Sequence, residues 1–295
     1  MPRNAKFAAV ILLALSTESV RPALSVSARS PQQEADRAAL RPAAAPDLPF
    51  NDYDSQAEQT LLMLANQSRS RAGAPPLRLD AGLSIAARAH ADAMVSAHAL
   101  SHQFAGEPSL AERLAASTHI QLDEAGENVA FDYDASDGHK HLMQSPPHRA
   151  NLLNASFNVV GLGVARSGDR LYIVEDFGRA LPAYSPEQVR GRVAETVAQM
   201  RRQVRQAKLT ENDFSAADEA ACSMAQADSL NTPAAHQLAR RYTLLTYTTL
   251  HPETLPAGAR RAITARNLHS FAVGACYART ETYPTGVYWV LLALD

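Results

Sequence analysis

The chain has 295 residues, of which 46% are hydrophobic and 20% are charged, and its formal net charge is -2. This length allows two domains, and the composition is neither that of a disordered chain nor that of a membrane-embedded one. The small net charge gives no indication of nucleic-acid binding.

The first 28 residues are predicted to be a signal peptide. Two basic residues, Arg3 and Lys6, precede an apolar run over residues 7–15 that is too short to span a bilayer. A small-residue sequence ending at Ala28 is a candidate cleavage site. The mature protein is therefore expected to be secreted, or to stay in the periplasm or cell envelope, without a membrane span.

Residues 29–53 contain several prolines and many alanines without apolar periodicity, so they are predicted to be a flexible linker. A helix is predicted next, with Asp54 or Ser55 as its N-cap and its end near Gly73. A second helix is predicted to follow the N-cap Asp80.

A short third helix is predicted over residues 109–116. Two apolar runs, at 159–165 and 171–177, are predicted to be strands joined by a turn at Gly168. These elements indicate an α+β fold in which helices flank a small antiparallel sheet.

Three polar candidates lie between the second helix and the strands. His102 follows the second helix, Glu127 lies in a turn-like segment over 126–130, and His148 lies in another over 145–151. No local chelating spacing joins the three residues, so only the fold could bring them together.

Residues 183–210 are predicted to contain a connecting helix. Ser185 and Gln188 form a capping box, with Pro186 at the first helical position. The helix carries many Arg and Lys residues opposite an apolar stripe. This charged face is interpreted as solvated, with a partner-binding basic face as the alternative.

Residues 211–295 are predicted to form a smaller α+β domain, which can be interpreted as a degenerate second copy of the first. Residues 160–166 can be aligned with residues 273–279, and residues 220–227 are rich in small residues with helical spacing, as residues 86–93 are. The stretch between these matches is shorter in the second copy and lacks an acid-and-histidine pair. A chance similarity of short apolar runs is the alternative.

The two cysteines of the chain, Cys222 and Cys276, both lie in this C-terminal segment. In an exported protein, an even number of cysteines within one domain favours a disulfide, here between a helix and a strand. Two separate buried thiols are the alternative.

Six segments in order resemble the CAP superfamily, also called the SCP or PR-1 domain, in its bacterial secreted form. The resemblance is carried by a first helix, the segment that leads into and forms the second helix, a Ser-His pair, a Gly-Glu-Asn motif, a Ser-Pro-Pro-His motif and a Gly-x-Gly strand, and it ends near residues 177–178. These segments are residues 61–66, 77–94, 101–102, 126–130, 145–153 and 160–164.

The resemblance implies a CAP-type α-β-α sandwich over residues 54–182, with His102, Glu127 and His148 in its cleft. His102 and His148 would bind Zn²⁺ or another divalent ion and leave a coordination position for water. Equally, a carboxylate beside two imidazoles could support proton transfer. The alternative is that Glu127 and His148 only stabilise loops.

Eukaryotic members of the family have a second acid shortly before the later histidine. Residues 142–145 contain no acid here. Glu175 or Asp176, on the last predicted strand, are possible substitutes.

Three functions remain open, and so does the question of whether the protein is an enzyme. The first is a secreted module that binds a divalent ion and an extracellular small or lipidic ligand. The second is a metal-assisted hydrolase of peptide or cell-envelope material, in which Glu127 would polarise water. The third is a structural or adhesive envelope protein with a vestigial cleft.

Overall fold

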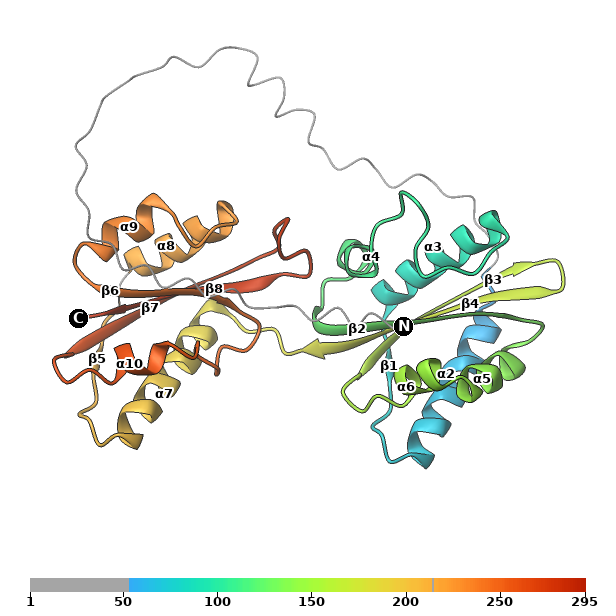
Figure 1. Ribbon diagram of the computed structural model, residues 1–295, viewed down its shortest axis with the longest axis horizontal. Helices are drawn as coiled ribbons and strands as arrows, with labels where there is room; N and C mark the ends of the chain where they lie inside the picture. The colour runs from blue at the N-terminus through green and yellow to red at the C-terminus, as the bar shows by residue number, and fades with distance from the viewer. Residues whose placement is uncertain (1–52, 214) are drawn as a thin grey trace, which may run out of the picture. The chain divides into compact units, whose positions relative to one another are not determined.

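The computed structural model describes residues 53–213 and 215–295. They form two three-layer sandwiches, called here the N-terminal and the C-terminal sandwich, each with helices on both faces of one sheet (Figure 1). The expected signal peptide and nearly all of the expected linker lie outside the described residues.

The N-terminal sandwich contains five helices and four strands. In chain order these are α2 (Ser55–Arg71), β1 (Arg78–Leu79), α3 (Ala81–Ala97), α4 (Leu110–Ser117), β2 (Gln121–Asp132), α5 (Ala135–Gln144), α6 (Pro146–Leu152), β3 (Val159–Ser167) and β4 (Arg170–Leu181).

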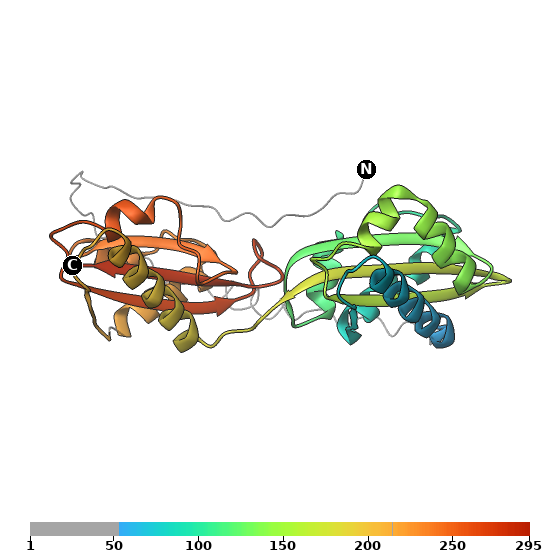
Figure 2. The same ribbon diagram turned by 90° about the horizontal axis from the view of Figure 1, so that it is seen from below.

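The sheet of the N-terminal sandwich has the order β1-β3-β4-β2, so β2 is an edge strand. The predicted hairpin is β3 and β4, which pair antiparallel and turn at Gly168. Helices α3 and α4 cover one face of the sheet, and α2, α5 and α6 cover the other (Figures 1 and 2). The expected α-β-α sandwich with a small antiparallel sheet is confirmed.

The predicted helix starts depend on local capping and are confirmed. The side chain of Asp54 accepts a hydrogen bond from the backbone N–H of Ala57, and that of Asp80 accepts one from Leu83. Ser109 and Glu112 form a capping box at the start of α4. Each cap satisfies backbone donors that the first helical turn leaves free.

Two segments differ from the turns that we expected. Glu127 lies in the middle of strand β2, and His148 lies in helix α6. The polar motif around Glu127 does not break the strand, because its polar side chains have partners on the neighbouring helices α4 and α6. Ser145 with Pro146 starts a helix, since proline suits the first helical turn.

The C-terminal sandwich follows with four helices and four strands among the described residues. In chain order these are α7 (Pro186–Gln203), β5 (Thr210–Glu211), α8 (Ser215–Gln226), α9 (Pro233–Ala239), β6 (Thr243–Thr249), α10 (Ala259–Ile263), β7 (Ser270–Ala278) and β8 (Val287–Leu294).

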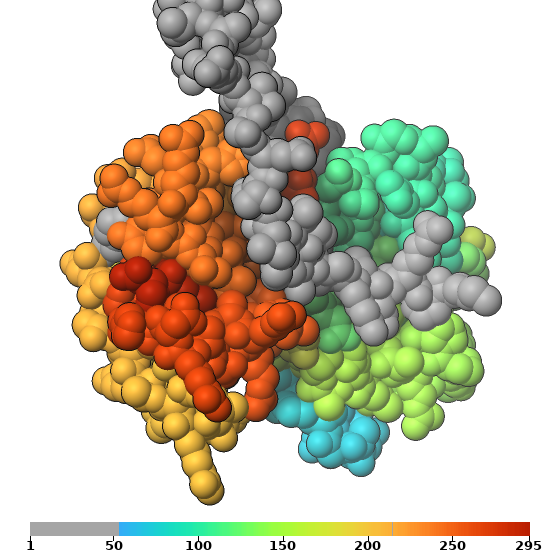
Figure 3. Space-filling model, turned by 60° about the vertical axis from the view of Figure 1, so that its left-hand side comes forward, coloured from blue at the N-terminus to red at the C-terminus, as the bar shows by residue number. Residues whose placement is uncertain are grey.

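We expected a connecting helix in residues 183–210, but α7 contributes to the core of the C-terminal sandwich. Val189, Val193 and Val197 are buried against its sheet. Arg201, counted above as part of a charged surface, is also buried. Its guanidinium donates to the carbonyl oxygens of Ala207, Ile263 and Ala265. The space-filling view shows the outer surface of the molecule from one side, coloured by residue number as in Figure 1 (Figure 3).

The two sandwiches share one topology. The second sheet has the order β5-β7-β8-β6, which matches β1-β3-β4-β2 strand for strand. The first pairs of the parallel strands, Arg78 with Val159 and Thr210 with Ser270, align the two copies and place Gly274 on Gly163. The sequence alignment given above was therefore displaced by two residues.

These glycines are required where a strand touches a helix. A Cβ atom at Gly163 would lie 2.2 Å from the backbone carbon of Ala87, and one at Gly274 would lie 2.2 Å from that of Ala217. The contacts align Ala87 of α3 with Ala217 of α8, so Met94 corresponds to Met224. Both methionines are fully buried.

A buried arginine recurs as well. Arg69, near the end of α2, donates hydrogen bonds to backbone carbonyl oxygens of the N-terminal sandwich, namely those of Pro75, Leu152, Asn154 and Phe157. Arg201 likewise donates to backbone carbonyl oxygens of the C-terminal sandwich. In both copies the Nε–H group of the arginine donates a hydrogen bond to the carbonyl oxygen of the residue six positions later.

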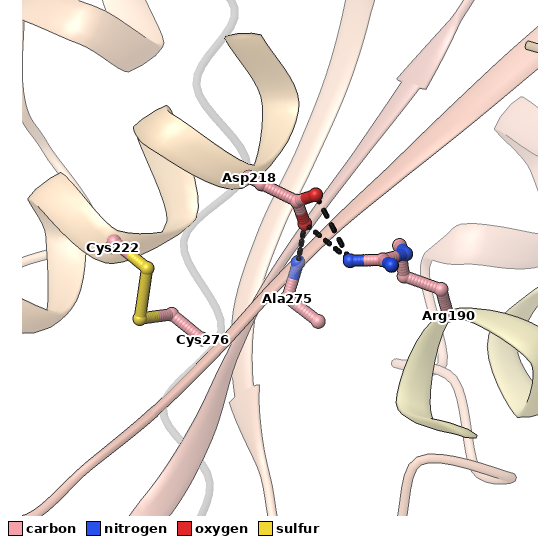
Figure 4. The surroundings of a disulfide bond; sticks show 5 residues. All are labelled: Arg190, Asp218, Cys222, Ala275 and Cys276. Atoms are coloured by element: carbon pink, nitrogen blue, oxygen red, sulfur yellow. Dashed lines mark hydrogen bonds and ion pairs between the residues drawn. A yellow bond between two sulfur atoms is a disulfide. The ribbon is translucent and has the colours of Figure 1, made fainter. Parts of the chain in front are cut away.

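An ion pair between the first two helices occurs in both copies with its charges exchanged. Arg88 of α3 binds Glu58 of α2, whereas Asp218 of α8 binds Arg190 of α7. In each copy the carboxylate also accepts a hydrogen bond from the backbone of the equivalent β3 or β7 residue, which is Ala275 in the second copy (Figure 4). The exchange preserves both functions of the pair.

The expected disulfide between Cys222 and Cys276 is present and joins α8 to β7 (Figure 4). It closes a segment with a sequence separation of 54 residues. Within residues 53–213 and 215–295, every helix is too short or too polar to cross a bilayer.

Candidate functional site

The candidate cleft lies beside edge strand β2, and Glu127 is its central acid. One carboxylate oxygen of Glu127 is 2.8 Å from Nδ1 of His102, which lies on the loop after α3. The other oxygen accepts a short hydrogen bond from the guanidinium of Arg113 on α4. The Glu127 side chain is only 4% exposed, whereas that of His102 is 61% exposed.

The geometry assigns the proton of the His102 ring. An ionised carboxylate only accepts hydrogen bonds, so Nδ1 of His102 is the donor to Glu127. Nε2 of His102 is then the nitrogen with a free lone pair, and it lies on an exposed ring.

His148 reaches the same region from α6. Burial lowers the pKa of this half-buried imidazole, and the nearby His102 lowers it further. Of the three residues that the family resemblance implied, the structure joins His102 and Glu127 by a hydrogen bond, and His148 is electrostatically coupled to His102.

Two asparagines hold α6 against β2. The Asn128 amide donates to the carbonyl oxygen of His148, and the Asn151 amide donates to the carbonyl oxygen of Glu127 and to the Asn128 side chain. Both side chains are buried. They place the helix that carries His148 next to the strand that carries Glu127.

A buried ionic network lies behind Glu127. Arg113 donates to Glu127 and to Glu107, and His90 of α3 lies 2.6 Å from Glu107. Burial alone would raise the pKa of Glu107, but hydrogen bonds from Phe104 and His90, together with the charge of Arg113, lower it overall. The His90 side chain is fully buried.

The two auxiliary acids lie on opposite faces of the sheet. Asp176 pairs with Glu127 across β2 and β4, so the two side chains share one face. Burial raises the pKa of Asp176 well above its usual value, and the charge of Glu127 raises it further. Glu175 points to the other face, where Asn128 donates to it. Neither acid is exposed.

His102 and His148 are the candidate nitrogen donors for a metal ion. The Glu127 carboxylate fixes the tautomer of His102, as carboxylates do behind zinc-binding histidines. Among the described residues, no group of three or more His, Cys, Asp or Glu side chains is arranged around one ion position.

The C-terminal sandwich has lost this site. By strand pairing, Glu127 and Asp176 correspond to Leu244 and Ala293. By the helix contacts described above, His90 corresponds to Ala220. Apolar residues replace these three ionisable residues there, and the sandwich keeps the same strand order.

Sequence reasoning missed the residues that support the cleft, namely Arg113, His90 and the two asparagines. Asn128 directly follows Glu127, and Asn151 lies three residues after His148, so the motifs already contained them. Arg113 and His90 carried no comparable signal, because their partners are distant in the sequence.

Comparisons with known proteins agree with this architecture. The model of the CAP family, described as the cysteine-rich secretory protein family, matches residues 62–177. YlbC of Bacillus subtilis strain 168, described as an uncharacterized membrane protein, is 30% identical over 139 residues, which is 47% of this chain and 39% of YlbC. The chain thus spans less than half the length of this relative.

Two solved structures are similar. An extracellular protein containing a SCP domain from Bacillus anthracis strain Ames is 27% identical, with 46% of this chain and 45% of that chain covered and a TM-score of 0.39. Na-ASP-1 is 9% identical, with 84% of this chain and 91% of that chain covered and a TM-score of 0.46. The match to the family model shows that residues 62–177 of the chain contain a CAP domain.

Proposed function

We propose that the cleft beside β2 binds a divalent metal ion, such as Zn²⁺, through His102 and His148, and with it an extracellular small or lipidic ligand. The observation that carries the proposal is the His102–Glu127 pair. The carboxylate engages Nδ1 and leaves Nε2 free on an exposed ring that is electrostatically coupled to His148. Imidazole nitrogen is a common ligand of zinc.

Binding without turnover is favoured over metal-assisted hydrolysis. A hydrolase of this type would use Glu127 to polarise water, but both oxygens of Glu127 already have partners, His102 and Arg113. Hydrolysis of peptide or cell-envelope material is the second candidate. Its support is His148, whose lowered pKa keeps the imidazole neutral and able to accept a proton near neutral pH.

A purely structural or adhesive role is the least favoured. The C-terminal sandwich shows the same strand order with apolar residues in place of Glu127 and Asp176. Since burying charges opposes folding, a chain with no use for the cleft would gain stability from those replacements in the N-terminal sandwich too.

We also propose that the protein acts outside the cytoplasm, either secreted or in the cell envelope. The disulfide between Cys222 and Cys276 supports this, because such bonds persist in oxidising compartments. The Bacillus anthracis protein with an SCP domain is described as extracellular.

Calorimetric titration with zinc tests the metal site. At about pH 7.5 the wild type should bind, and His102→Ala and His148→Ala should each bind much more weakly, with unchanged circular dichroism. Binding should also weaken as the pH falls toward about 5.5, because protons compete with the metal for the imidazole nitrogens. For His148, whose pKa is lowered, this competition begins at a lower pH than for an ordinary imidazole.

His141→Ala is the matched control for this titration. His141 forms a similar pair with Asp132, with its ring 59% exposed and the carboxylate 9% exposed, but it lies outside the cleft. Its loss should leave zinc binding unchanged. Undiminished binding by the His102→Ala, His148→Ala double variant would show that the ion binds elsewhere and would overturn the proposal.

A further inference from the structure

The loop that carries His102 is attached to the buried side chain of His90. Nε2 of His90 lies 2.8 Å from the carbonyl oxygen of Ser101, the residue directly before His102. A carbonyl oxygen only accepts hydrogen bonds, so this nitrogen is the donor whatever the charge of the ring. The contact joins the middle of α3 to the backbone beside the cleft.

The other side of the His90 ring is held as firmly. Nδ1 lies 2.6 Å from a carboxylate oxygen of Glu107 and 2.9 Å from the guanidinium of Arg113. The same guanidinium binds Glu127, and Glu107 also accepts from the backbone N–H of Phe104. The ring of His90 therefore has partners on both nitrogens and no freedom to turn.

His102 itself has few contacts of its own. Its ring is mostly exposed, and its hydrogen bonds with other described residues are the one to Glu127 and a 3.4 Å contact from Arg113 to its carbonyl oxygen. The direction of such a ring depends on where the backbone before it is fixed. Ser101 is that point, and His90 fixes it.

The C-terminal sandwich indicates that the fold does not require a histidine here. Ala220 occupies the position equivalent to His90 on α8, and it is fully buried. One turn later on the same helix face, Met94 and Met224 are both retained. The helix packing is thus kept in both copies, whereas the histidine occurs only in the copy that has the cleft.

We propose that His90 is a positioning residue of the cleft, which fixes the Ser101 carbonyl and thereby holds His102 against Glu127 with Nε2 directed outward. The consequence for metal affinity rests on the proposed function above. The positioning itself does not, because it concerns the protein without metal.

Imidazole nitrogen NMR spectra of the metal-free protein test the positioning directly. At about pH 8, above the ordinary histidine pKa of about 6.5, neutral His102 should be held in the tautomer with the proton on Nδ1. His90→Ala should release it toward the Nε2-protonated form that free imidazole prefers. His90→Gln, whose amide can still donate to Ser101, should keep the Nδ1 form.

Met94→Ala is the control for loss of packing alone. It removes buried side-chain volume from the same face of α3, and His102 should stay in the Nδ1 form. Should His90→Ala fail to fold, His90→Met fills the space without a donor and is expected to give the same release. An unchanged His102 tautomer in the donor-less variants, or equal release by Met94→Ala, would overturn the inference.

Zinc titration of the same variants separates this inference from the metal proposal. His90→Ala should lower the affinity about tenfold, as loss of a partner behind a metal ligand typically does, and His90→Gln should restore most of it. A wild type with a fixed Nδ1 tautomer but no zinc binding would refute the metal site and leave the positioning role intact. Wild-type affinity in His90→Ala would instead refute the positioning role.

Discussion

At the scale of single residues, Glu175 shows how strongly the fold alters an ordinary side chain. It is fully buried under α5 and α6, and its single hydrogen bond comes from Asn128. Its other oxygen has no hydrogen-bond partner among the described residues. Burial raises its pKa from 4.5 to about 7, because the charged form loses its hydration.

This pKa predicts how stability depends on pH. The folded protein retains the proton of Glu175 up to about pH 7, whereas the unfolded chain loses it near 4.5. The contribution of this group to stability is therefore full below 4.5 and declines as the pH rises to about 7.

Glu175→Gln should remove that decline, since a carboxamide does not ionise. The free energy of unfolding should exceed that of the wild type at high pH, by at most about 3 kcal/mol at about 1.4 kcal/mol per pH unit. Urea denaturation followed by circular dichroism, at pH values from about 4 to 8, measures the free energy of unfolding of both proteins. This range covers the pH values at which the folded and unfolded states bind different numbers of protons. Parallel curves would mean that Glu175 is charged in the folded protein.

At the scale of elements, the exchanged ion pair shows that the two copies share a geometry rather than a residue. Arg190 on α7 and Asp218 on α8 are partly exposed, so each side chain alone contributes modestly. The carboxylate nevertheless has a second function, because it accepts the backbone N–H of Ala275. The pair needs one acid and one base, and either helix can supply the acid.

A double substitution tests this equivalence. Arg190→Glu alone should place two acids together, Asp218→Arg alone should place two bases together, and each should cost roughly 1–2 kcal/mol. The double variant should recover most of the loss, because it recreates the arrangement of Glu58 and Arg88. A double-mutant cycle from urea denaturation measures the coupling, expected to be about 1 kcal/mol; additive losses would contradict it.

Local chemistry explains which elements could be predicted from the sequence. Caps such as Asp54, Asp80 and the capping box at Ser185 act within one helical turn, so the sequence alone locates them. The role of α7 was not evident, because its charged residues suggested a solvated surface. Burial of Arg201 depends on carbonyl groups about 60 residues away, at Ile263 and Ala265, which no local pattern reveals.

The site was predictable to a similar extent. His102, Glu127 and His148 could be named because the family motifs carry them, and the structure shows a hydrogen bond between His102 and Glu127. Sequence reasoning did not find Arg113 or His90, whose contacts run between α3, α4 and β2. Residues that hold the site residues in place lie far apart in the sequence, and only the tertiary fold brings them into contact.

At the scale of the whole molecule, the two copies differ in the ionisable groups that they bury and in the bonds that stabilise them. The N-terminal sandwich keeps buried ionisable groups, which are costly unless they are paired. The C-terminal sandwich has apolar replacements and the disulfide between Cys222 and Cys276. The single tryptophan, Trp289, is buried in this second sandwich and reports on its folding.

Removing the disulfide should therefore affect the C-terminal sandwich without affecting the cleft. Cys222→Ala with Cys276→Ala should lower the free energy of unfolding by about 4 kcal/mol, from the chain entropy of a loop of this length. Denaturation followed by Trp289 fluorescence measures this loss, and zinc titration of the same variant should give wild-type affinity. An unchanged midpoint of the fluorescence transition would contradict the first expectation and mean that the disulfide adds no stability. Weakened zinc binding would contradict the second and mean that the cleft depends on the C-terminal sandwich.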